Sequence, residues 1–68
     1  MDRIIQTRRF GAHRVGLLES IEDDGAATYS VLVDDVVVTD PPLDRMPGFE
    51  DLVRIYARSQ EAAGGGPR

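Results

Sequence analysis

Residues 13–38 read HRVGLLESIEDDGAATYSVLVDDVVV, and this stretch decides the fold of the 68-residue chain. Apolar and polar residues alternate over residues 13–22 and 27–34, and the second of these segments is rich in the β-branched and aromatic residues that suit a pleated strand. The turn sequence Asp23-Asp24-Gly25 separates the two segments. The pattern therefore predicts an antiparallel hairpin.

The apolar pattern also selects the register of this hairpin. A three-residue loop with Gly25 in the left-handed conformation pairs Leu17 with Val31. A four-residue loop would slip the pairing by one and set Gly16 against Val33, which wastes apolar surface. With the three-residue loop, one face of the sheet collects Val15, Leu17, Ile21, Ala27, Tyr29, Val31 and Val33.

A second hairpin is predicted around Asp34-Asp35, taken as a two-residue loop. This loop pairs Val33 with Val36 and starts a third strand over residues 36–40. The prolines within residues 40–42 (DPP) end the sheet, because proline has no N–H to donate to the ladder.

A helix is predicted over residues 49–62, with Gly48 as its N-cap and an apolar stripe made of Phe49, Leu52, Val53 and Tyr56. The predicted fold class is α+β: a three-stranded antiparallel β-meander packed on one C-terminal helix. Residues 1–12 form a basic arm. The sequence leaves open whether residues 3–10 of this arm add a fourth strand at the edge of the sheet. Residues 1–61 are predicted to form one domain, and residues 62–68, with their glycine run, are predicted to be a disordered tail.

The composition limits what a chain of this size can do. It has 12 acidic and 8 basic side chains, one histidine and no cysteine, which excludes disulfides, thiolate metal sites and thiol nucleophiles. A domain of about 60 residues buries only about 60% of its unfolded surface, so we expect shallow pockets and reinforcement by self-association. Neither a signal-like apolar run nor an apolar stretch of ~20 residues is present, and we expect a cytoplasmic protein with no membrane contact.

Charge is distributed unevenly along the chain. Residues 1–14 hold four arginines against Asp2, which gives +3, and residues 15–54 hold ten carboxylates against two arginines, which gives -8. The basic arm supports an alternative function, nucleic-acid binding, in which arginines contact phosphates. The competing interpretation is an edge strand kept soluble by charge. The candidate phosphate contacts are Arg3, Arg8, Arg9 and Arg14.

No catalytic or metal-binding pattern is visible. His13 is the only histidine, and as a general base it would need an orienting carboxylate supplied by the fold. The acidic run Glu22-Asp23-Asp24 lacks the alternate spacing of a calcium loop. We therefore predict that the protein is not an enzyme and binds no metal or cofactor.

The second face of the predicted sheet is also apolar at its centre. It carries Leu18, Leu32 and Val37, which one helix cannot cover if that helix lies on the other face. Such a patch suggests a binding partner or a second copy. The alternative is that the N-terminal arm folds over the patch with its apolar residues Ile4, Ile5 and Phe10.

The order of strand, acidic hairpin, tyrosine-containing strand, third strand and helix resembles the small partial RNase H-like domain of the HicB-type antitoxins. The matching segments are residues 21–25 (IEDDG), 29–31 (YSV) and 49–52 (FEDL). The Asp-Leu-Pro-Gly-Cys stretch of that family is absent, and residues 33–36 (VDDV) stand in its place. The resemblance implies a β-β-β-α topology over residues 15–60 and transfers no functional residue.

These observations predict a non-enzymatic protein-interaction or regulatory module. We expect it to form a homodimer and to bind a further, unidentified protein partner, with Leu18, Leu32 and Val37 as candidate interaction residues.

Overall fold

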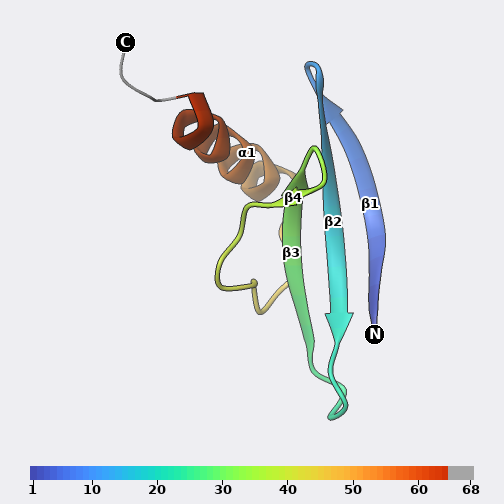
Figure 1. Cartoon of the computed structure of the whole chain (residues 1–68). Coiled ribbons are helices and arrows are strands. Elements are labelled where there is room, and N and C mark those ends of the chain that lie inside the picture. Colours follow the sequence, from blue (N-terminus) through green and yellow to red (C-terminus); the bar gives the residue numbers. More distant parts are fainter. Residues whose placement is uncertain (65–68) are drawn as a thin grey trace.

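In the computed structural model of the chain, which describes residues 1–64, a four-stranded antiparallel sheet is followed by one helix (Figure 1). The predicted α+β meander is confirmed, and the N-terminal arm supplies its fourth strand. In sheet order the elements are β1 (Asp2–Phe10), β2 (His13–Ile21), β3 (Ala27–Val33) and β4 (Val36–Val37), and the helix is α1 (Phe49–Gly64).

The β2–β3 hairpin has the predicted register. Leu17 pairs with Val31, and the N–H of Glu22 donates to the carbonyl of Ala26 at 2.8 Å to close the loop. Gly25 has a φ of 89°, in the left-handed region that favours glycine. The three-residue loop therefore keeps the apolar residues of both strands on one face.

The β3–β4 hairpin has the predicted two-residue turn, and both of its residues, Asp34 and Asp35, adopt positive φ (51° and 71°). Strand β4 contains two residues where five were expected. The chain leaves the sheet after Val37 and rejoins it at one isolated bridge, where Leu43 pairs with Tyr29.

Strand β1 contains a bulge that explains its two adjacent isoleucines. Ile4 pairs with Leu18 and Gln6 pairs with Leu17, so Ile5 is the extra residue between them. Ile5 packs against the core, whereas Ile4 shares the opposite face with Leu18. Neighbouring strand residues lie on opposite faces in any case, and the one-residue register shift at the bulge determines that Ile5 is the one facing the core.

Helix α1 begins as predicted. The carbonyl of Gly48 accepts the N–H of Leu52 at 3.0 Å, and the N–H of Gly48 donates to Asp51 Oδ2 at 3.1 Å. The helix ends at Gly64, so residues 62–64 of the predicted tail form its last turn. The remainder of that tail, residues 65–68, lies outside the described residues.

The buried stripe of α1 differs from the predicted one. Leu52 is buried and Ile55 and Tyr56 pack against the core, but Phe49 and Val53 remain 56% and 41% exposed. The helix is rotated so that Ile55, and not Val53, faces the sheet. As the single helix in residues 1–64, α1 lacks the length and apolarity needed to cross a membrane.

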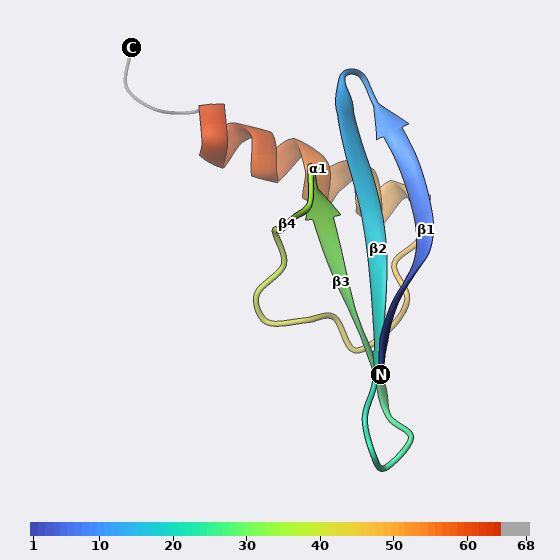
Figure 2. The same cartoon turned by 45° about the vertical axis from the view of Figure 1, so that its right-hand side comes forward.

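The core lies between α1 and one face of the sheet. Figure 2 shows α1 crossing behind the strands, with its C-terminal half projecting beyond β4 and the front face of the sheet uncovered. The β2–β3 hairpin extends past the helix, which leaves Ile21 39% exposed although the sequence pattern placed it on the core face. The buried apolar residues of this core are Val15, Leu17, Val31, Val33 and Leu52.

Candidate functional site

The face of the sheet that points away from α1 brings together the three predicted interaction residues. Leu32 pairs directly with Val37, and Leu18 lies on the adjacent strand. Ile4 joins them, because the β1 bulge places it opposite Leu18. Leu18 and Leu32 are half-buried, while Ile4 and Val37 are 52% and 51% exposed. We call Ile4, Leu18, Leu32 and Val37 the open-face patch.

The N-terminal arm does not fold over this patch. Ile5 and Phe10 lie on the helix side, where the ring of Phe10 makes edge contacts with Tyr56 and Phe49 at centroid distances of 5.1 and 6.0 Å. Ile4 lies within the patch and covers none of it. The open-face patch is thus uncovered within residues 1–64.

Gly16 lies at the centre of this face, paired with Leu32 on β3. A Cβ atom at Gly16 would meet Gln6 O at 3.9 Å and Ile4 Cδ1 at 4.0 Å, which are ordinary van der Waals distances. The monomer therefore has room for a side chain here, and glycine costs a strand roughly 0.5–1 kcal/mol relative to alanine. It leaves a shallow hollow of about 310 Å³ lined by Ile4, Thr7, Arg14, Gly16, Leu32 and Asp35.

The open face is basic at one end, where Arg9 and Arg14 outnumber Asp35, and acidic at the other, where Asp2 lies. Arg9 and Arg14 pair with each other across β1 and β2 at one end, and Arg14 Nη2 also donates to Asp35 Oδ2 at 2.9 Å. Asp2 lies at the other end of β1, next to the acidic turn of residues 22–24. Like charges directly opposite each other destabilise a sheet, so the pairing of Arg9 with Arg14 is unfavourable. Arg9 has no ion-pair partner among the described residues.

The four arginines of the alternative prediction are divided between the two faces of the sheet, with Arg3 and Arg8 on the helix side and Arg9 and Arg14 on the open side. Those on the helix side have partners within the chain. Arg3 Nε donates to Glu19 Oε1 at 3.2 Å, and the Arg8 guanidinium lies 5.1 Å from the centre of the Phe49 ring. The four side chains therefore do not form one basic surface.

The fold supplies His13 with a carboxylate. His13 Nδ1 lies 2.6 Å from Asp34 Oδ2, and the N–H of Arg14 donates to Asp34 Oδ1 at 3.0 Å. The hydrogen bond with His13, followed by that from Arg14, lowers the pKa of Asp34. Extending the predicted β2–β3 register by one residue would have placed Asp34 beside Arg14. The arrangement ties the β3–β4 turn to the start of β2.

The described residues offer no metal site. In residues 1–64 no group of three or more His, Cys, Asp or Glu side chains is placed to hold a metal ion.

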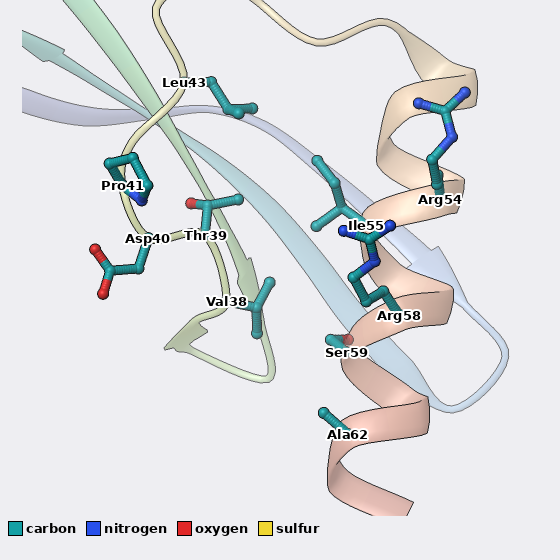
Figure 3. Close-up of a pocket in the computed structure, with 10 residues that line it drawn as sticks. All are labelled: Val38, Thr39, Asp40, Pro41, Leu43, Arg54, Ile55, Arg58, Ser59 and Ala62. Carbon is teal, nitrogen blue, oxygen red and sulfur yellow. The ribbon is translucent and has the colours of Figure 1, made fainter. Parts of the chain in front are cut away.

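A groove of about 740 Å³ lies between α1 and the segment after β4 (Figure 3). Its apolar lining includes Val38, Leu43 and Ile55, and the charged residues that line it are Asp40, Arg54 and Arg58. Its charged rim is of mixed sign and indicates no particular ligand charge.

Three elements of the open face were missed by sequence reasoning. Ile4 entered only the alternative in which the N-terminal arm covers the patch, because the bulge that turns it outward leaves no mark in the apolar pattern. Gly16 offered a signal, since glycine inside a strand often marks the close approach of another backbone or ligand. The opposed charges of Arg9 and Asp2 become visible only when the strand register is known.

The strand order β1-β2-β3-β4 followed by α1 contains the β-β-β-α order that the HicB-type resemblance implies for residues 15–60, but this order does not test the resemblance itself. That resemblance stays a prediction. No protein-family model, no curated protein and no solved structure matches this chain.

Proposed function

We propose that this chain is a non-catalytic interaction module of the cytoplasm that forms a homodimer through the open-face patch. One observation carries the proposal: an uncovered apolar patch surrounds a strand glycine that the monomer does not need. Exposed apolar patches with polar rims mark interaction sites on soluble proteins. The surfaces that the dimer leaves free, including the acidic turns, are proposed for a further protein partner.

The size of the core supports self-association. Among the described residues, five apolar side chains form the buried core, and below about 70–80 residues a single core rarely supplies more than ~3–5 kcal/mol. Chains of this size commonly gain stability from disulfides, metals or oligomers, and this chain has no cysteine. Each half-exposed side chain of the patch would gain about 1 kcal/mol on burial.

Adjacent residues of β4 provide the test. Val36 and Val37 are both exposed (63% and 51%), but Val37 belongs to the open face and Val36 to the helix side. Sedimentation velocity at high micromolar concentration should show a dimer for the wild type and for Val36→Asp, and a folded monomer for Val37→Asp. Circular dichroism checks the fold of each variant. A wild-type chain that stays monomeric would contradict the proposal.

Nucleic-acid binding through the arginine arm has less support from the geometry. Arg3 and Arg8 are engaged within the chain and lie on the opposite face from Arg9. Phosphate contacts weaken as salt rises, so a binding assay in low salt is the sensitive test of this alternative.

A further inference from the structure

We infer that two copies of the chain pack face to face about a two-fold axis that runs across the strands, so that the basic end of each open face lies over the acidic end of the other. In this arrangement Leu18 of each copy enters the hollow at Gly16 of the other. The inference rests on the proposed function, because it specifies the geometry of the same dimer.

The strand register arranges the side chains of the open face in four rows. Residues paired between antiparallel strands share a face, and successive residues on one face are two positions apart, about 6–7 Å along the strand. From the basic end, the rows are Arg9 and Arg14; Thr7, Gly16, Leu32 and Val37; Ile4, Leu18 and Ser30; and Asp2, Ser20 and Thr28.

Two orientations of a two-fold axis allow such sheets to meet face to face. An axis parallel to the strands places each row over the same row of the other copy, which brings the two basic ends together. An axis across the strands reverses the order, so the first row lies over the fourth and the second over the third. Because juxtaposed like charges oppose association, the second orientation is favoured.

The glycine hollow fits the same orientation. The axis then passes between the second and third rows, and β2 of one copy lies over β2 of the other. Leu18 of one copy consequently faces Gly16 of its mate, at the roughly 10 Å spacing of packed sheets. The missing side chain at Gly16 makes room for the leucine, which accounts for a glycine that the monomer does not require.

The charges on β1 also match. With β1 over β1, Arg9 of one copy faces Asp2 of the other, and the symmetry repeats this contact. Together the two side chains are long enough to span the roughly 10 Å between packed sheets. The contact gives Arg9 an acidic partner that its own chain does not provide within residues 1–64, where Arg14 lies opposite it.

Charge reversal tests the arrangement. In homodimers of Arg9→Asp the new carboxylate faces Asp2, and in homodimers of Asp2→Arg the new guanidinium faces Arg9. Each variant alone should dimerise roughly tenfold more weakly than the wild type. An equimolar mixture should form heterodimers with wild-type affinity, because both contacts then join opposite charges. Native mass spectrometry identifies the heterodimer, and sedimentation equilibrium gives the Kd.

Matched variants in the loop before α1 control for the change in net charge. Asp44 and Arg45 are exposed residues on the helix side, and Asp44→Arg and Arg45→Asp should each leave the Kd unchanged. Unfolding of Arg9→Asp provides a second check. Its monomer should be no less stable than the wild type, since the substitution replaces a like-charge pair with Arg14 by an opposite-charge pair.

The outcomes separate this inference from the proposed function. If the wild type dimerises but both reversals keep its Kd and show no preference for the heterodimer, the axis across the strands is overturned while the homodimer stands. If the wild type stays monomeric at high micromolar concentration, both are overturned. Weakened homodimers together with a restored heterodimer support the arrangement.

Discussion

Gly16 lies directly opposite Leu32 in the middle of the open face, at a position where the chain's own fold would accept a Cβ atom without a clash. A β-branched residue is favoured over glycine in a strand, both for backbone entropy and for packing on the sheet. The packing of the monomer therefore does not account for glycine at this position. In the proposed dimer the entry of Leu18 from the other copy accounts for it.

Gly16→Val should consequently have opposite effects on the monomer and on the dimer. We expect the folded monomer to gain roughly 0.5–1 kcal/mol, measured by denaturant unfolding at low protein concentration. We expect the dimer to be lost, measured by sedimentation at high concentration, because the valine fills the hollow. Thr7→Val, an isosteric change in the same row, should preserve the dimer. Dimerisation of Gly16→Val with wild-type affinity would refute this account of the glycine.

Two adjacent helix residues test the observed orientation of α1. Leu52 is 2% exposed within the core, whereas Val53 is 41% exposed, although the sequence pattern assigned both to the buried stripe. Leu52→Ala should cost about 2–5 kcal/mol, enough to unfold most of a domain of this size at room temperature. Val53→Ala should change the stability by less than about 1 kcal/mol, because little buried surface is lost. Thermal or urea unfolding gives both values, and equal losses would place the helix in a different rotation.

Three neighbouring strands contribute to an ionisable cluster on the helix side. Tyr29 Oη donates to Glu19 Oε2 at 3.3 Å, and Arg3 donates to the other oxygen of the same carboxylate. Burial, followed by the negative charge of Glu19 and this hydrogen bond, raises the pKa of Tyr29 above 10.0. The neutral phenol is the form that the fold favours, so this contribution to stability is present below pH 10 and is lost as the pH rises through the folded pKa.

The chain has two tyrosines, so a spectrophotometric titration of Tyr56→Phe reports on Tyr29 alone. The remaining phenol should titrate above pH 10, and adding Glu19→Gln should move the titration to lower pH by removing the nearby charge. Glu50→Gln, at an exposed position in the first turn of α1, serves as the control for net charge. An identical titration with and without Glu19 would show that the carboxylate does not act on Tyr29.

The sequence was most informative where a slip of one residue would have exposed a whole apolar face. The register that pairs Leu17 with Val31 keeps the apolar residues of both strands on one face. This register requires a three-residue loop, and that loop length predicts the left-handed conformation of Gly25. The two-residue turn at Asp34-Asp35 followed from the same alternation. These local signals fixed the central hairpins, and hence the fold class.

The sequence was least informative where the decisive contact was tertiary. Ile4 and Ile5 are chemically equivalent neighbours, and only the bulge in β1 determines which of them faces the core. In α1, apolar residues occupy so many positions that two stripes are available. The angle at which the helix crosses the sheet selects the one containing Ile55 over the one containing Val53. The bulge likewise decides that Ile4 joins the open-face patch and that Arg3 lies on the helix side.

The contact between His13 and Asp34 should make stability depend on pH in the acidic range. The folded-state pKa of Asp34 lies below its ordinary value of 3.8, because His13 and the N–H of Arg14 hydrogen-bond the carboxylate. A lowered pKa means that the folded state favours the charged form. This contribution is therefore present above about pH 4 and is lost as the pH falls through the folded-state pKa.

Asp34→Asn removes the charge of the carboxylate and little else, since asparagine tolerates the positive φ of 51° at this position and is nearly isosteric with aspartate. We expect the variant to melt at a lower temperature than the wild type at pH 5, and the two melting curves to converge as the pH is lowered toward 2. His13→Asn should reproduce part of the loss at pH 5, because the imidazole makes the hydrogen bond that contributes most to the lowered pKa. Melting temperatures that differ by the same amount at pH 5 and pH 2 would show that the carboxylate's charge does not stabilise the turn.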